Sequence, residues 1–269
     1  MNPLYISAYT VNFDDYSTLG RWIAASEGKG VGVELATAWK TPDFYEKLEE
    51  NAFRFSGVPV TLHAPFVEIC TDPGSREEAE MQALFDRAFA LYRRFSARSM
   101  VMHTHEGTIV PERRQWAQER SFQVLQRMAR RAAEEGAALT VENVGYPAKG
   151  NQLFDLPQFI ELIEALPREP GCLIDVGHAL LNGWEIPQVI RRLGTRICGY
   201  HLHTNDGQRD RHWPLFVPES VLSAAQTEEI LNTIAQVTPK AHVILEYSPK
   251  CGVTEDVIHH DLQALRQYI

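Results

Sequence analysis

The hydrophobic pattern alternates between short apolar runs and longer amphipathic stretches along the whole chain. The short runs are rich in β-branched residues, and several are apolar nearly throughout, which is typical of parallel strands covered on both faces. Eight of them are predicted as strands: Leu4–Thr10, Gly30–Ala38, Val58–Phe66, Ser99–His105, Ala138–Val144, Cys172–Ala179, Ile197–Thr204 and His242–Ser248.

The stretches between these runs predict helices, because apolar residues recur in them every three or four positions. Met81 and Phe85, for example, fall on one face of such a helix. Asp155 and Thr254 stand where helix N-caps are expected. The clearest helical stretches are Arg76–Ala97, Glu112–Glu135, Asp155–Leu166, Thr227–Val237 and Thr254–Ile269.

The order of these elements predicts one (β/α)₈ barrel domain over residues 1–269. Alternating strands and helices favour a parallel sheet, and eight repeats in a chain of this length favour closure. An open, doubly wound sheet is the alternative, but no GxGxxG follows the first strand. The glycines at residues 28–32 lead into the second strand and do not open a helix. We therefore expect an α/β barrel with its site at the C-terminal ends of the strands.

Composition narrows the classes of protein that the chain can belong to. It is 44% apolar, which allows a sizeable core, and it has no apolar run of about 18 residues that would span a membrane. A net charge of −9 disfavours nucleic acid as a partner. The four cysteines are widely spaced and the first residues lack a signal pattern, so we expect free thiols and a cytoplasmic protein. A homo-oligomer is left open.

Carboxylate or imidazole side chains stand at the ends of seven consecutive runs, from the second to the eighth. The C-terminal ends of parallel barrel strands converge, and buried ionisable groups need a cation or hydrogen bonds. Taken singly, each could merely bond within the barrel, and for Glu34, His105 and His203 that interpretation stays open. The set is Glu34, His63, His103, His105, Glu142, Asp175, His178, His201, His203 and Glu246, with Asp210 and His212 following the seventh run.

The donor types indicate which metal such a site prefers. Glu142, Asp175, His201 and Glu246 offer three hard oxygen donors and one imidazole, which suits Mn²⁺, Mg²⁺ or Co²⁺. Further donors would allow one or two additional ions, for which Zn²⁺ becomes suitable. These are His63, His103, His178, Asp210 and His212. No cysteine joins the set, so a structural zinc site is not expected, and no organic cofactor is evident.

As a set, these motifs resemble the xylose isomerase-like barrel superfamily, which contains endonuclease IV and many sugar isomerases and epimerases. The resemblance covers nearly the whole chain. In the isomerase branch it implies one divalent ion held by Glu142, Asp175, His201 and Glu246, with His203 able to replace His201. His178 would then contact substrate oxygens. The motifs are His63-Ala-Pro, Glu142-Asn, Asp175-Val-Gly-His178, His201-Leu-His203-Thr-Asn-Asp-Gly, Asp210-Arg-His212 and Glu246.

The hypothesis that follows is a metal-dependent isomerase or epimerase acting on a small sugar, sugar phosphate or cyclitol. Glu142 and Glu246 would remove and return a proton next to a carbonyl through a metal-stabilised enediolate. Substrate contacts are expected from His178 and from Arg209 or Arg211. An apolar wall is expected from Trp39, Phe66 and Trp213.

The alternative is a zinc-dependent endonuclease for abasic DNA, or another phosphodiester hydrolase. Positions resembling the larger ligand set of endonuclease IV are present, but the loops after the strands contain few lysines. A nucleic-acid binder normally carries a basic stripe. A barrel that keeps the ligands without catalysis is a third interpretation. The resembling positions are His63, His103, Glu142, Asp175, His178, His201, Asp210, His212 and Glu246.

Overall fold

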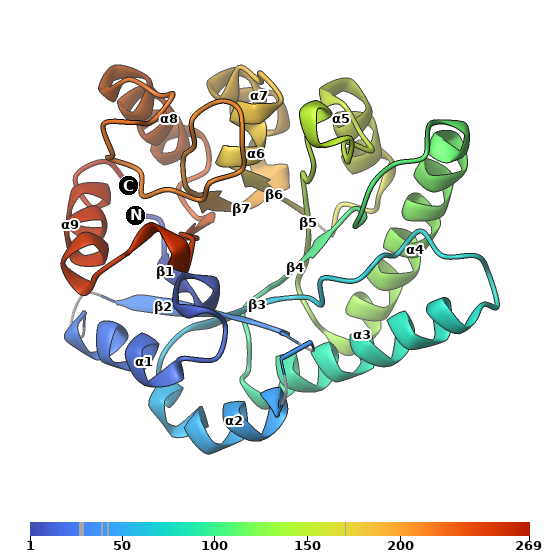
Figure 1. Cartoon of the computed structure of the whole chain (residues 1–269), viewed down its shortest axis with the longest axis horizontal. Helices are drawn as coiled ribbons and strands as arrows, with labels where there is room; N and C mark the ends of the chain where they lie inside the picture. Colours follow the sequence, from blue (N-terminus) through green and yellow to red (C-terminus); the bar gives the residue numbers. More distant parts are fainter. Residues whose placement is uncertain (27–29, 39, 42, 170) are drawn as a thin grey trace.

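The computed structural model describes residues 1–26, 30–38, 40–41, 43–169 and 171–269. Within them, eight parallel strands pair in chain order, and the last pairs with the first to close a barrel (Figure 1). This confirms the predicted (β/α)₈ fold and excludes the open sheet. The strands are β1 (Leu4–Ser7), β2 (Val31–Ala36), β3 (Val60–His63), β4 (Met100–His103), β5 (Leu139–Glu142), β6 (Gly171–Asp175), β7 (Ile197–Leu202) and β8 (His242–Leu245).

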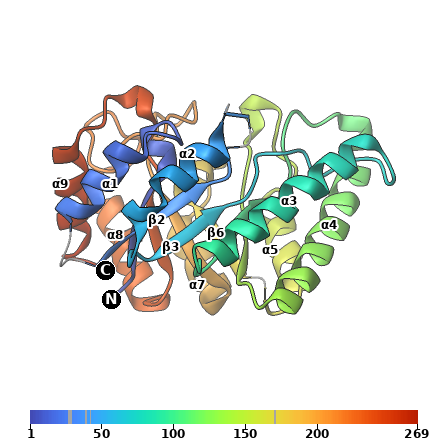
Figure 2. The ribbon, with the colours of Figure 1, turned by 90° about the horizontal axis from the view of Figure 1, so that it is seen from below.

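Helices surround the barrel on its outside (Figures 1 and 2). They are α1 (Tyr16–Ala25), α2 (Phe44–Asn51), α3 (Arg76–Arg94), α4 (Arg114–Glu135), α5 (Leu156–Ala165), α6 (Val176–Leu181), α7 (Ile186–Leu193), α8 (Ala224–Val237) and α9 (Glu255–Leu265). Asp155 caps α5 by accepting the backbone N–H of Gln158 at 3.0 Å. Thr254 caps α9 by accepting that of Val257 at 3.4 Å. Both N-cap predictions are confirmed.

The structure differs from the predicted elements in two ways. First, α1, α2 and α7 are not among the clearest predicted helical stretches. They are only 8 to 10 residues long, and helical periodicity is hard to distinguish at that length. In addition, all eight predicted strands extend beyond the C-terminal end of the observed strand, and two of these runs continue into helical turns. The run Leu4–Thr10 leaves it after Ser7 and forms the 3₁₀ turn η1 (Ala8–Val11), and the run Cys172–Ala179 passes into α6. A buried helical turn is as apolar as a buried strand, so the pattern alone does not mark the boundary.

The inside of the barrel is filled by a small apolar cluster of Tyr5, Val101, Leu173 and Ile244. The alternate residues of β1, such as Leu4 and Ile6, pack with the helices in the main core. Gly32 on β2 makes room for the Tyr5 ring, since a Cβ there would lie 2.4 Å from it. The interior cluster therefore closes the barrel below the C-terminal ends of the strands.

No helix among the described residues is both long enough and apolar enough to cross a bilayer. All four cysteines are free, as their spacing predicts. Only Cys198 is exposed, and Cys172 is buried.

Candidate metal centre

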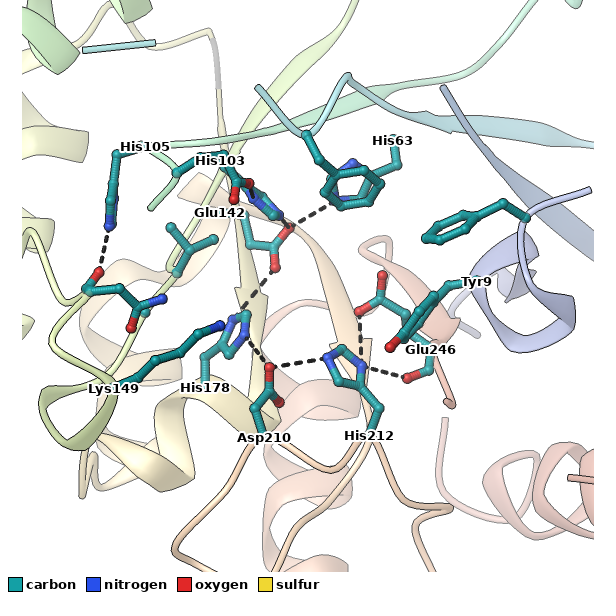
Figure 3. Close-up of a pocket in the computed structure, with 16 residues that line it drawn as sticks. Tyr9, His63, His103, His105, Glu142, Lys149, His178, Asp210, His212 and Glu246 are labelled. Carbon is teal, nitrogen blue, oxygen red and sulfur yellow. Dashed lines mark hydrogen bonds and ion pairs between the residues drawn. The ribbon is translucent and has the colours of Figure 1, made fainter. Parts of the chain in front are cut away.

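A cavity of about 350 Å³ opens at the C-terminal end of the strands (Figure 3). Its wall combines carboxylates and imidazoles with a group of aromatic side chains. The lining residues are Tyr9, Phe13, His63, Phe66, His103, His105, Glu106, Glu142, Val144, Gly145, Lys149, Asn151, His178, Asp210, His212 and Glu246.

Four predicted ligands meet at one ring nitrogen beneath the cavity. Nδ1 of His201 lies 3.4 Å from Glu142 Oε1, 3.4 Å from Glu246 Oε2 and 3.9 Å from Asp175 Oδ2. All four residues are buried. Nδ1 of His201 and Oε2 of Glu142 have no hydrogen-bond partner in the described part of the chain. Three carboxylates buried together need compensating positive charge, so these donors fit a divalent cation.

The second histidine of this segment, His203, reaches the same carboxylates from the other side. Its Nε2 lies 2.9 Å from Asp175 Oδ2, and its ring stacks on His212 with centroids 3.8 Å apart. The ring nitrogens of His203 and His212 and a carboxylate oxygen of Glu246 lie within 4.8 Å of one another. The structure thus brings both His201 and His203 to the predicted ligand set.

Two further groups of three donors flank this centre. Nε2 of His63 and Nε2 of His103 lie 3.6 and 3.4 Å from Glu142 Oε2. On the opposite side, Asp210 Oδ2 lies 3.1 Å from His178 Nε2 and 3.3 Å from His212 Nε2 (Figure 3). Donor atoms within each group lie no more than 4.8 Å apart, a spacing that a single ion can bridge.

The junction of β5 and β6 fixes the first two carboxylates relative to each other. The Asn143 amide donates to the backbone carbonyl of Asp175 at 3.1 Å and accepts its N–H at 2.8 Å. Asp175 also caps α6 by accepting the backbone N–H of His178 at 2.6 Å. Side-chain oxygens of Asp and Asn satisfy such backbone donors, so the Glu-Asn and Asp-x-x-His motifs build this edge locally.

The loop after β7 folds back over the site. Thr204 and Trp213 form an antiparallel bridge, which returns the chain to the barrel. His212 adopts a left-handed backbone conformation, with φ of 48°, and its Nδ1 donates to the Glu246 carbonyl at 3.0 Å. This turn places Asp210 and His212 against the cavity although they lie beyond the strand.

Neighbouring charges shift the pKa values of the clustered groups. Burial alone would raise the pKa of Glu142, but the charges of His201 and His103 lower it well below its ordinary value. Burial likewise opposes the effect of the carboxylates on the histidines, whose net pKa rises to about 10 for His103 and about 9 for His212. These shifts favour an ionised Glu142 carboxylate beside positively charged imidazoles.

Some predicted substrate contacts reach the cavity and others do not. His178 and Phe66 line it. Arg209, Arg211 and Trp213 are not among its lining residues, because their loop is tied to itself: Asp206 accepts from the Arg209 backbone at 2.8 Å and from the Arg211 side chain at 3.0 Å. Trp39 lies outside the described residues.

Seven residues that line the cavity were not predicted as site residues: Tyr9, Phe13, Glu106, Val144, Gly145, Lys149 and Asn151. Tyr9 and Phe13 follow β1, the one predicted strand without an ionisable residue at its end, so no signal drew attention to them. Lys149 and Asn151 lie in the loop after β5, where Lys149 belongs to the 3₁₀ turn η4 (Pro147–Lys149). A lysine in a loop after a barrel strand was the available signal for this side of the cavity.

The fold and this cluster together define a (β/α)₈ barrel that gathers carboxylates and imidazoles at the C-terminal ends of its strands. Residues 24–268 match the xylose isomerase-like TIM barrel family, and the chain belongs to that family. Comparison with curated proteins finds no match.

Solved structures share this fold at low sequence identity. One is a D-tagatose 3-epimerase-like protein, with a TM-score of 0.75, 16% identity and 98% of each chain covered. Another is the IolI protein with a bound zinc atom, with a TM-score of 0.75, 16% identity and 99% of each chain covered. A third is 3-keto-D-glucoside 4-epimerase from E. coli, with a TM-score of 0.71 and 13% identity, covering 99% of this chain and 100% of the other.

Proposed function

We propose that the protein is a divalent-metal-dependent isomerase or epimerase of a small sugar or a related polyol. The observation that carries this proposal is the buried group of Glu142, Asp175 and Glu246 around Nδ1 of His201, directly beneath a cavity of about 350 Å³. Two of the similar structures, the D-tagatose 3-epimerase-like protein and 3-keto-D-glucoside 4-epimerase, support the same class of reaction.

Glu142, Asp175 and Glu246 would hold the ion together with one imidazole, either that of His201 in β7 or that of His203 directly after this strand. Exchanging each histidine for asparagine and measuring Mn²⁺ affinity decides between the two, since loss of a direct ligand has the larger effect. When bound, a divalent ion would polarise a substrate carbonyl and make the neighbouring C–H more acidic. Mn²⁺, Mg²⁺, Co²⁺ and Zn²⁺ all suit this mixed set.

The proton transfer is assigned to the two glutamates. Glu142 leaves β5 and Glu246 follows β8, three strands further around the barrel, so they reach the cavity from different sides (Figure 3). One carboxylate takes the proton from carbon, and the electron pair moves toward the carbonyl to give an enediolate. The other glutamate, in its carboxylic-acid form, gives a proton to the opposite face, which inverts a centre, or to the adjacent carbon, which moves the carbonyl once a proton also passes between the two substrate oxygens. Proton exchange with water then returns both carboxyl groups to their starting states. The charges of His201 and His103 lower the pKa of Glu142, so this carboxyl is ionised at neutral pH.

The rest of the cavity suits a polar molecule with C–H faces. Tyr9, Phe13 and Phe66 form an aromatic wall, with ring centroids 5.1 Å apart for Tyr9 and Phe13 and 5.7 Å apart for Phe13 and Phe66. Sugar C–H faces pack on such rings, while His178 and Lys149 offer polar contacts to hydroxyls or a phosphate across the cavity. Phe66 and His178 line the cavity, which supports the substrate contacts proposed for them.

Solvent deuterium exchange tests the assignment. The protein is incubated in D₂O and Mn²⁺ with a panel of ketoses, their phosphates and 3-keto-glycosides, and incorporation at carbon is followed by NMR. Glu142→Gln and Glu246→Gln should each lose incorporation. Glu78→Gln, a buried carboxylate outside the cavity lining, is the matched control and should retain it. Exchange retained in both site variants would exclude the two-glutamate mechanism.

A second candidate function, phosphodiester hydrolysis, is favoured by the two flanking donor groups. His63 with His103, and His178 with Asp210 and His212, offer ligands for further ions, and clustered ions assist phosphodiester cleavage. A net charge of −9 weighs against a DNA substrate. Metal analysis separates the two: one Mn- or Mg-like ion per chain supports the isomerase, whereas two or three zinc ions with cleavage of an abasic duplex at low salt support the hydrolase.

A further inference from the structure

Glu34 on β2 is a buried carboxylate below the cavity, with 1% of its surface exposed. It follows Gly32 by two residues, so its side chain also points into the barrel, one layer nearer the C-terminal end. Its two oxygens lie 3.2 and 3.3 Å from Nε2 of His201. In the part of the chain that the structure describes, His201 is the one side chain that forms a hydrogen bond or ion pair with it.

A packing role explains this pair poorly. The layer just below contains Tyr5, Leu173 and Ile244, which fill the barrel without a charged group. Burying a carboxylate there has a desolvation cost, which an apolar side chain of similar volume would avoid. The carboxylate is therefore better explained by what it does to its partner than by packing. The partner, His201, turns its other nitrogen toward Glu142, Asp175 and Glu246. Glu34 therefore acts on the only ring that faces all three carboxylates at once among the described residues.

We propose that Glu34 is a positioning residue of the metal centre, which it serves by accepting the Nε2–H of His201 and so directing Nδ1 at the three carboxylates. The inference rests on the proposed metal site but not on the reaction or on the substrate. It requires that Nδ1 of His201 binds the ion directly, because a ring that keeps its proton on Nε2 offers only a lone pair at Nδ1.

The physical reason lies in the asymmetry of imidazole. A ring flip would replace Nδ1 by a carbon atom, and the alternative tautomer would move the proton to the wrong nitrogen. A carboxylate can only accept hydrogen bonds, so Glu34 requires a proton on Nε2 and disfavours both errors. Carboxylate partners of metal-site histidines act in this way, and their loss typically weakens metal affinity about 10- to 100-fold.

The test compares Glu34→Gln with two reference variants. Glutamine keeps the size of the side chain but can offer an NH₂ to Nε2, so the ring orientation is no longer enforced. Asp175→Asn reports the loss of a proposed ligand, and Glu78→Gln reports a buried carboxylate lost from between α3 and α4, where it pairs with Arg120 and Arg127. Mn²⁺ affinity is measured from the EPR signal of free Mn²⁺, and circular dichroism checks the fold.

A second readout starts from the wild-type protein. In Zn²⁺-loaded wild-type protein with ¹⁵N-labelled histidine, His201 should carry its proton on Nε2, with a low-field proton signal typical of a bond to carboxylate. Its assignment comes from the signal that disappears in His201→Asn. In Glu34→Gln this signal should move upfield or vanish, and Mn²⁺ affinity should fall about 10- to 100-fold. Glu78→Gln should change neither.

Several results would overturn the inference. An unprotonated Nε2 of His201 in the wild type removes its basis directly. Unchanged Mn²⁺ affinity in Glu34→Gln rejects the positioning role while the metal site stands. A loss as complete as in Asp175→Asn makes Glu34 a ligand instead. Wild-type protein that binds neither Mn²⁺ nor Zn²⁺ rejects the proposed function together with this inference. The two failures are distinguishable, because the first is seen in the wild type and the second only in Glu34→Gln.

Discussion

Gly177→Ala is expected to weaken both the fold and metal binding, because there is no room for a methyl group beside His203. An ideal Cβ at position 177 would lie 1.9 Å from Cε1 and 2.3 Å from Nδ1 of that ring. His203 is fully buried, stacked on His212 and bonded to Asp175 at 2.9 Å, so the ring has nowhere to retreat. The ring or the first turn of α6 must move, and the contact with Asp175 breaks.

The change in the free energy of unfolding caused by Gly177→Ala is the balance of opposing effects. Position 177 lies in a helix, where alanine gains at most about 1 kcal/mol over glycine. Overpacking costs about 1–3 kcal/mol, and losing a hydrogen bond to a charged group costs about 1.5–3 kcal/mol. The two costs exceed the gain, with a net destabilisation of roughly 1.5–6 kcal/mol. At roughly 2–4 °C per kcal/mol for a domain of this size, Tm should fall by several degrees or more.

Gly20→Ala in α1 is the matched control. It is also a helical glycine, but its Cβ would meet the flexible Arg54 side chain at 3.1 Å. Thermal unfolding should show Gly20→Ala within about 1 kcal/mol of wild type. Gly177→Ala should unfold earlier and bind Mn²⁺ more weakly. If Gly177→Ala matches the wild type in both Tm and Mn²⁺ affinity, the argument from close contact with His203 is refuted.

Three further predictions concern metal, acid and thiols. Mn²⁺ at 100 times its Kd should stabilise the native state by about 2.7 kcal/mol, and EDTA or Asp175→Asn should abolish the rise in Tm; an unchanged Tm argues against a metal site. The Gly74 N–H, Arg120 and Arg127 lower the pKa of Glu78 below 4.5, so this ion stabilises the fold above pH 4.5 and ceases to as pH falls through the lowered pKa. The Tm difference between wild type and Glu78→Gln should therefore shrink on acidification, and a constant difference contradicts the sign. Of four thiols, Cys198 is exposed, so a thiol reagent should modify one per native chain quickly; rapid modification of all four would indicate an open fold.

The eight strands could be predicted because each is a dense apolar run, and the long helices α3 and α4 because their periodicity persists over many turns. The short helix α7 was not predicted, although it buries Ile186, Val189, Ile190 and Leu193. Eight residues hold too few repeats to separate a helix from an irregular apolar segment. Tertiary packing against the barrel supplies the stability that such a helix lacks alone.

The candidate site shows the same division. Glu142, Asp175, His201 and Glu246 could be predicted because they interrupt or end apolar runs, and parallel strand ends converge. A substrate contact was predicted from Arg209 or Arg211, but neither lines the cavity, and both bond to Asp206 within their own loop. Tyr9 was overlooked and lines the cavity. Loop conformation decides which side chains reach inward, and it depends on contacts that periodicity does not describe.

The sequence by itself determined the class of fold and which ionisable residues gather at one end of it, because eight alternating strands and helices favour closure and because the C-terminal ends of parallel strands share one face. Only the tertiary structure decided how the donors are arranged. It set Nδ1 of His201 among three carboxylates, placed Asp210 and His212 through a returning loop, and put Glu34 behind the ring. The contact between Glu34 and His201 joins residues 167 positions apart at 3.3 Å, a distance that barrel closure fixes.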